Sequence, residues 1–158
     1  MDSQAVEIIG RSRLVEQLLL GGIEVASPLR DHGVDLIAYL DTGLDLKEFA
    51  ACPIQMKAAT GRSFSISAKY GKFPNLIHAF VWNVSSPEAE IYAMTQAEAV
   101  AVATELGYTE TASWLAGDYY TNTKVSGKLL DLLQPYRMTA YLWREKVESA
   151  MRAVRTTL

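Results

Sequence analysis

Three polar side chains in short apolar segments carry the most evident chemistry of this sequence. Asp35 stands near the start of VDLIAYL (34–40), and Gln55 and Lys57 alternate with apolar residues in PIQMKA (53–58). Alternate side chains of a strand point to opposite faces, so Gln55 and Lys57 share one face. Burial of an amide or an ammonium without a partner is costly. We therefore expect both to face outward, where they can do chemistry.

If the two segments are neighbouring strands, a carboxylate, an amide oxygen and an ammonium meet at one end of a sheet. The oxygens of Asp35 and Gln55 could hold Mg²⁺, which prefers oxygen ligands, and the backbone carbonyl of Met56 could supply a third. Mg²⁺, or Mn²⁺ in its place, supplies an activated water and neutralises phosphate charge. Lys57 could orient that water or stabilise the transition state. This set of groups is suited to phosphodiester hydrolysis.

The apolar periodicity around these residues predicts one helix, then a series of strands, then further helices. Gly21 and Gly22 would end the first helix, and Thr95 with Glu98 would form a capping box at the start of a later one. The expected helices are 4–20, 95–106, 126–133 and one from Thr139 onward; the expected strands are 23–28, 34–40, 53–58, 63–67, 76–84 and 89–94. Residues 108–125 are loop-like.

This order of elements predicts an α+β fold with a mixed sheet in a single domain that spans 1–158. Segment 76–84 is the most apolar strand and should lie inside the sheet, with 89–94 as its hairpin partner. In the first helix we expect the stripe of Ile8, Val15 and Leu19 to face the core.

Composition excludes several classes of protein. The chain has 158 residues, of which 49% are hydrophobic and 21% charged, which is typical of a globular domain. Its one cysteine, Cys52, excludes an internal disulfide. No apolar run approaches the roughly 18 residues of a membrane span, and the N-terminus lacks the apolar segment of a signal peptide. We expect a soluble, cytoplasmic protein without membrane contact.

The charge distribution favours a polyanionic partner at one face, although the net charge is −3. Between Pro53 and Ser86 there is no acidic residue, whereas this segment holds Lys57, Arg62, Lys69 and Lys72. Such a basic segment could contact a phosphate backbone; solvated loop lysines are the alternative.

Other chemistry has little support. The sequence has no nucleophile elbow, Walker loop or zinc-protease motif, and no histidine lies near Cys52. His32 and His78 fit turn and core positions. Trp114, Tyr119 and Tyr120 could stack on bases or pack in a core or a dimer interface.

The segments GVDLIAYL and PIQMKAA resemble the PD-(D/E)XK nuclease superfamily, and in particular its small homing and restriction-type members with a Q-x-K half-motif. The resemblance covers about residues 8–60. It implies a restriction-endonuclease-like α-β-β-β-α-β core at about 4–106, with extra C-terminal helices in an extension at about 107–158. It also implies Mg²⁺-dependent DNA cleavage and often a homodimer. In this resemblance Asp35 and Gln55 are the metal ligands and Lys57 is the catalytic lysine.

Two positions depart from the family pattern. Val34 replaces the usual proline, and Gln55 replaces the usual acid, so the site carries one negative charge fewer. Many members supply a further carboxylate from the first helix, where Glu16 is our candidate and Glu7 is less well placed. The expected function is a Mg²⁺-dependent DNA endonuclease, with Arg62, Lys69 and Lys72 on the DNA. The alternative is a catalytically inactive nucleic-acid-binding or oligomerising module on the same fold.

Overall fold

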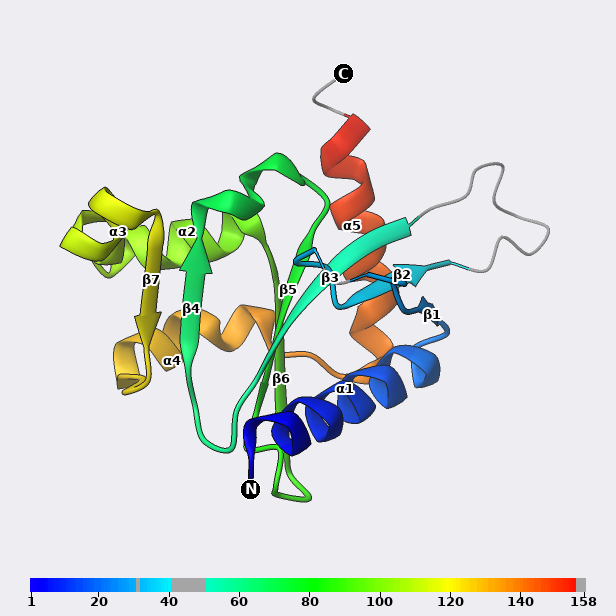
Figure 1. Cartoon of the computed structure of the whole chain (residues 1–158). Helices are drawn as coiled ribbons and strands as arrows, with labels where there is room; N and C mark the ends of the chain where they lie inside the picture. The colour runs from blue at the N-terminus through cyan, green and yellow to red at the C-terminus, as the bar shows by residue number, and fades with distance from the viewer. Residues whose placement is uncertain (31, 41–50, 156–158) are drawn as a thin grey trace.

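The computed structural model describes residues 1–30, 32–40 and 51–155 (Figure 1). In chain order the elements are α1 (Ser3–Leu20), β1 (Glu24–Ala26), β2 (Leu36–Tyr39), β3 (Ala51–Ala58), β4 (Phe64–Ser67), the 3₁₀ turn η1 (Ala68–Lys72), β5 (Ile77–Trp82), β6 (Glu90–Thr95), α2 (Gln96–Glu105), η2 (Tyr108–Glu110), α3 (Ala112–Gly117), β7 (Tyr119–Asn122), α4 (Gly127–Leu133), η3 (Gln134–Tyr136), η4 (Ala140–Leu142) and α5 (Trp143–Arg155). This arrangement confirms the α+β class.

The ends of the helices follow from local hydrogen bonding. Asp2 caps α1 by accepting a bond from the Ala5 amide at 2.8 Å, as expected of an aspartate at this position. The predicted capping box of α2 is confirmed: the Thr95 hydroxyl accepts from the Glu98 amide, and the Glu98 carboxylate accepts from the Thr95 amide at 2.7 Å. These caps fix where the two helices begin.

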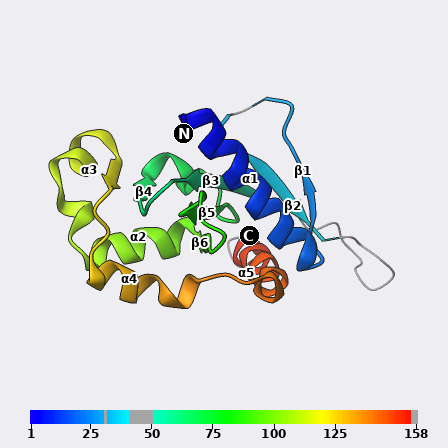
Figure 2. The same cartoon turned by 90° about the horizontal axis from the view of Figure 1, so that it is seen from below.

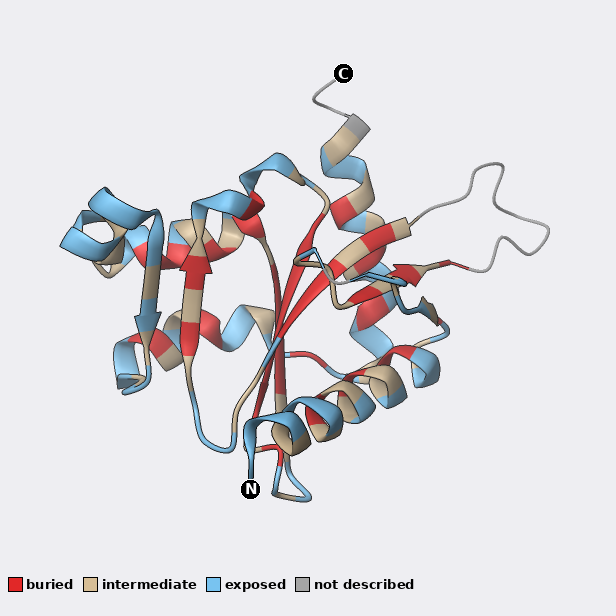
Figure 3. Cartoon of the chain, viewed as in Figure 1, coloured by how far each residue is buried: buried red, intermediate tan, exposed pale blue. Residues whose placement is uncertain are grey.

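The central sheet has five strands in the order β1-β2-β3-β5-β6. The pairs are antiparallel except β3 and β5, which run parallel. Strand β5 lies between β3 and β6 and is buried at all six positions, as Figure 3 shows. Its interior position and its hairpin with β6 are therefore confirmed.

The connection between the two parallel strands differs from the implied α-β-β-β-α-β order. Residues 59–76, all described, form β4 and the short turn η1 and contain no α-helix. Strand β4 leaves the central sheet and pairs with β7 in a separate two-stranded ribbon.

Two hydrophobic clusters cover opposite faces of the central sheet. On one face α1 and α5 pack against the sheet through residues such as Leu14, Leu18 and Trp143. On the other face β4, α2 and α4 pack around Phe80 and Trp82. Figure 2 shows α2 and α4 running next to each other, remote from α1. The sheet is thus the middle layer, and its strand ends are where polar groups can collect.

The C-terminal segment is part of this core. Residues 108–125, which we expected to be a loop, form η2, α3 and β7, and β7 completes the ribbon with β4. Trp143 in α5 is fully buried, and its indole N–H donates to the Gln17 side chain of α1 at 2.7 Å. Residues 107–155 are therefore integral to the packing. No helix of the described residues is both long and apolar enough to cross a membrane.

The buried face of α1 differs from the expected one. Ile8 and Leu19 are 58% and 51% exposed, whereas Gly10, Leu14 and Leu18 face the sheet. The helix carries its own apolar residues on most of its sides, so periodicity alone does not predict which side is buried. Gly10 does: an added Cβ would lie 2.5 Å from the Cβ of Ala58, so only glycine lets α1 approach the end of β3 this closely.

We predict that Gly10→Ala destabilises the protein by about 1–3 kcal/mol, because the clash outweighs the gain in helix propensity. Urea denaturation would measure this. The matched control is Gly127→Ala at the start of α4, where an added Cβ meets nothing within 4 Å. Equal stability of the two variants would contradict this account of the α1–β3 contact.

Candidate functional site

The candidate site forms where β2 begins beside β3. The Asp35 amide donates to the Ile54 carbonyl at 2.8 Å, which extends the strand pairing by one residue. One carboxylate oxygen of Asp35, Oδ2, accepts from the Met56 amide at 2.6 Å and from Gln55 Nε2 at 2.7 Å. The same Nε2 lies 3.1 Å from the Met56 carbonyl oxygen. The structure therefore brings together the three residues expected to hold the metal.

Gln55 is buried, contrary to the expectation that it faces outward; only 6% of it is exposed. Cys52, Ile54 and Met56 of β3 pack in the cluster under α1 and α5, so Gln55 points to the opposite face. There the hydroxyl of Tyr70, on η1, donates to Gln55 Oε1 at 2.9 Å. This bond replaces the water that the amide would otherwise need.

A glycine makes room for Tyr70. Gly33 has a φ of +88°, and an added Cβ there would lie 3.3 Å from a ring carbon of Tyr70. A side chain at this position would therefore be strained by the backbone and would also press on the ring. The chain entering Asp35 can pass close to Tyr70 and Gln55 because residue 33 is glycine.

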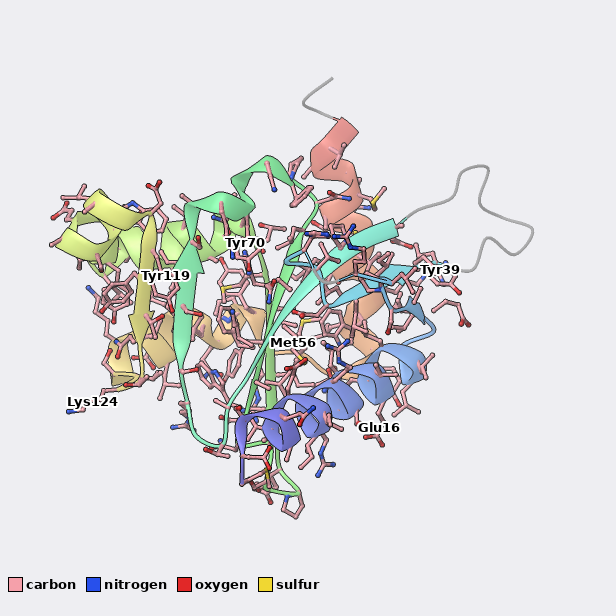
Figure 4. The ribbon with its side chains drawn as sticks, in the orientation of Figure 1. Glu16, Tyr39, Met56, Tyr70, Tyr119 and Lys124 are labelled. Carbon is pink, nitrogen blue, oxygen red and sulfur yellow. The ribbon has the colours of Figure 1, made fainter. Side chains whose placement is uncertain are left out.

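A cavity of about 310 Å³ opens in front of these groups, between the first turns of α1 and the end of β3. Its lining residues are Ser3, Glu7, Asp35, Gln55, Met56, Lys57 and Ala58. Lys57 is exposed, as expected, and is one of these lining residues. Figure 4 labels Met56 between α1 and Tyr70.

Glu7, and not Glu16, is the acid of α1 that lines the cavity. Nine residues of helix separate the two carboxylates by about 13 Å along the axis and by about half a turn around it. Figure 4 shows Glu16 on the outer side of the helix, directed away from Met56. The face of α1 that packs on the sheet is the one with Gly10, Leu14 and Leu18, and not the predicted one, so Glu16 lies away from the cavity.

Arg11 connects Glu7 to the strand. Its guanidinium donates to a Glu7 carboxylate oxygen at 3.0 Å and to the Asp35 carbonyl oxygen at 2.9 Å. Arg11 is one turn after Glu7, so both lie on the side of α1 that contacts Asp35. No sequence motif marked Arg11 or Tyr70, because each acts through a contact distant in the chain.

The other basic residues are not among the lining residues of this cavity. Lys69 and Lys72 are exposed on η1, and the Lys69 ammonium lies 4.8 Å from the centre of the Tyr70 ring. Arg62 instead pairs with Glu90 at 3.2 Å. It lines a separate cavity of about 490 Å³ with Glu88 and Glu90, so its charge is largely balanced.

The groups at the cavity fit a small, hard cation. Asp35, Gln55 and Met56 offer the oxygen ligands that such a cation prefers, although Gln55 faces Asp35 with its nitrogen. Among the described residues no group of three or more His, Cys, Asp or Glu side chains could hold a metal ion. Gln55 Nε2 lies 2.7 Å from the Asp35 oxygen and 3.1 Å from the Met56 oxygen. Neighbouring ligands of an octahedral Mg²⁺ are about 2.9 Å apart. An amide oxygen at this position would therefore be spaced as a ligand.

Cys52 is unsuited to nucleophilic chemistry. It is fully buried, and burial raises the pKa of its thiol to about 12, so the reactive thiolate does not form near neutral pH.

His78 lies on β5 directly opposite Gln55 of β3, and its burial confirms the expected core position. Burial lowers the pKa of His78 to about 4; the hydrogen bond with Gln96 acts in the other direction, and the nearby Lys57 charge lowers the pKa further. Gln96 donates to the Ser67 carbonyl, so its oxygen faces His78 Nε2 at 2.6 Å and accepts from it. His78 is thus a neutral structural residue.

Comparisons with protein-family models, with curated proteins and with solved structures found no match to this chain.

We predict that stability decreases as the pH falls from about 6.5 to about 4. In this range the unfolded state binds a proton at His78 that the folded state does not. The free energy of unfolding therefore falls by up to about 1.4 kcal/mol for each pH unit. Urea denaturation at several pH values would show this slope, and His78→Gln should remove its contribution. The exposed His32, changed to Gln, is the control; a wild-type slope in His78→Gln would contradict the assignment.

Proposed function

We propose that this chain is a Mg²⁺-dependent DNA endonuclease with a PD-(D/E)XK-type site. The observation that carries the proposal is the convergence of the Asp35 carboxylate, the Gln55 amide and the Met56 carbonyl at a cavity that also contains Glu7 and Lys57. These groups come from α1, from the residue before β2 and from β3, and they are the types that the resemblance requires.

The topology supports a restriction-endonuclease-like core in part. A helix followed by three antiparallel strands, the third of them parallel to β5, fits the order of elements that the resemblance implies. The β4 and η1 connection takes the place of the expected crossover helix. We propose that this connection is a local replacement, because it still returns the chain to the edge of β3 in the parallel direction.

The roles of the side chains follow from their positions. Asp35, Gln55 and Met56 would hold Mg²⁺ through their oxygens. Glu7, which pairs with Arg11 at 3.0 Å, would have to turn from Arg11 to add the negative charge that Gln55 lacks. When bound, Mg²⁺ supplies an activated water and a countercharge for the phosphate. Lys57, exposed at the same cavity, can hold the water or the phosphate oxygen by donating hydrogen bonds.

The approach of DNA is best accounted for by the exposed lysines. Lys69 and Lys72 project from η1, whose Tyr70 contacts Gln55, so a phosphate backbone at the cavity could also reach them. Arg62 would first have to leave Glu90, so we give it a lesser role.

We predict that Lys57→Ala abolishes cleavage of supercoiled plasmid in Mg²⁺, a loss of at least about 100-fold. The side chain is exposed, so the unfolding free energy should stay near the wild-type value. The control is Lys128→Ala, an exposed lysine on α4. Cleavage by Lys57→Ala at the wild-type rate would exclude the mechanism.

A wild-type protein that binds DNA but cuts neither plasmid nor single-stranded circular DNA would support the inactive binding module. In that case affinity should fall steeply with salt and should not depend on Mg²⁺.

A matched pair of variants tests the acid from α1. Glu7→Gln should weaken Mn²⁺ binding by about tenfold, because it removes a full negative charge from the cavity. Glu16→Gln, the same change on the same helix, should leave the affinity unchanged. Titration calorimetry with Mn²⁺ measures both; equal affinities would remove Glu7 from the site.

A further inference from the structure

We propose that Tyr70 is a positioning residue of this site. Its hydroxyl holds the Gln55 amide in either of two orientations, and the orientation decides whether a nitrogen or an oxygen faces Asp35. This inference rests on the proposed function, since the second orientation belongs to the cation-bound state.

The observed orientation satisfies every polar atom of the amide. Oε1 accepts from the Tyr70 hydroxyl at 2.9 Å, and Nε2 donates to Asp35 Oδ2 at 2.7 Å and to the Met56 carbonyl at 3.1 Å. Both Gln55 and Tyr70 are only 6% exposed, so these bonds replace water. Among the described residues, no buried side-chain nitrogen or oxygen lacks a partner.

This orientation is incompatible with a cation ligated by Gln55, because an NH₂ group donates hydrogen bonds and does not coordinate metals. A half-turn of the amide exchanges its oxygen and nitrogen, which have nearly the same size. The Gln55 oxygen would then face two other oxygens, those of Asp35 and Met56. Without a cation these dipoles and the carboxylate charge repel, so the turned amide is stable only with a cation present.

Tyr70 can serve both orientations, because a phenol hydroxyl both donates and accepts. In the observed state it donates to Oε1, and after the half-turn it would accept from Nε2. Its ring has little freedom to move. On one side Gly33 lies so close that an added Cβ would be 3.3 Å from a ring carbon. The His78 ring lies edge-on, with its centre 5.1 Å away. The Tyr70 hydroxyl therefore stays in place while the Gln55 amide rotates and its oxygen and nitrogen exchange positions.

The loss of this hydroxyl should affect the two states unequally. Without it, the metal-free state keeps the bond from Gln55 to Asp35 and leaves only a carbonyl oxygen unpaired. The cation-bound state leaves a buried N–H group unpaired. Buried N–H groups without partners are rarer in proteins than carbonyl oxygens with unused capacity. Tyr70→Phe should therefore weaken Mn²⁺ binding, by at least about fivefold.

The experiment is a double-mutant cycle on Mn²⁺ affinity, measured by titration calorimetry without DNA. It compares wild type, Tyr70→Phe, Gln55→Glu and the double variant. A glutamate has two equivalent oxygens and nothing to turn, so Tyr70→Phe should have no effect on Mn²⁺ affinity in the Gln55→Glu background. The control is Tyr141→Phe, which changes a tyrosine that is 90% exposed.

The possible outcomes distinguish a failure of the proposed function from a failure of the role of Tyr70. A wild-type protein that binds no Mn²⁺ overturns the proposed function together with this inference. Binding that is equal in wild type and Tyr70→Phe overturns the role of Tyr70 alone. An equal loss of affinity in both backgrounds also overturns it, because a merely structural tyrosine would be needed in both.

A second measurement needs no variant and so remains informative if Tyr70→Phe fails to fold. The side-chain amide of Gln55 gives two ¹⁵N–H signals in NMR spectra. Addition of Mg²⁺ should shift both, because the NH₂ group exchanges a carboxylate partner for a hydroxyl. Signals that stay in place while Mg²⁺ binds would overturn the half-turn.

Discussion

The carboxylate of Asp35 joins the two strands on which the candidate site depends. One of its oxygens accepts both a backbone amide and a side-chain amide from consecutive residues of β3. Charged acceptors make the stronger hydrogen bonds of proteins, so this double contact fixes the start of β2 against β3. It also accounts for a buried amide in a strand whose other face is apolar. Tyr70 of η1 covers Gln55, and the first turns of α1 lie across the cavity that Asp35 and the end of β3 line.

Local sequence patterns predict much of this arrangement. The capping box at Thr95 and Glu98 and the apolar run of β5 each depend on residues a few positions apart, and each formed as expected. The proximity of Asp35 and Gln55 was predictable for the same reason: two short strands joined by one connection commonly pair with each other. Patterns of this kind identify the strands and the residues at their ends.

The rest depends on contacts that sequence spacing does not reveal. Gln55 is buried because Tyr70, fifteen residues later and in a 3₁₀ turn without apolar periodicity, covers it. The sequence favours Glu16 over Glu7 because α1 has apolar residues on several sides. The close approach of Gly10 to Ala58 is what determines which face of α1 packs on the sheet. The sequence predicts Arg62 as a phosphate contact, yet its partner Glu90 is at the start of β6, 28 residues away. In each case tertiary packing determined the outcome.

The contact between α1 and α5 has a consequence for how the protein is made. Gln17 and Trp143 are hydrogen-bonded across a separation of 126 residues, and Trp143 fills the core next to α1. A chain leaving the ribosome from its N-terminus therefore cannot complete this face of the sheet until α5 has emerged. Loop closure over such a distance is entropically unfavourable and slows folding. During synthesis the apolar side of the sheet that Trp143 covers therefore stays exposed to water until α5 has left the ribosome.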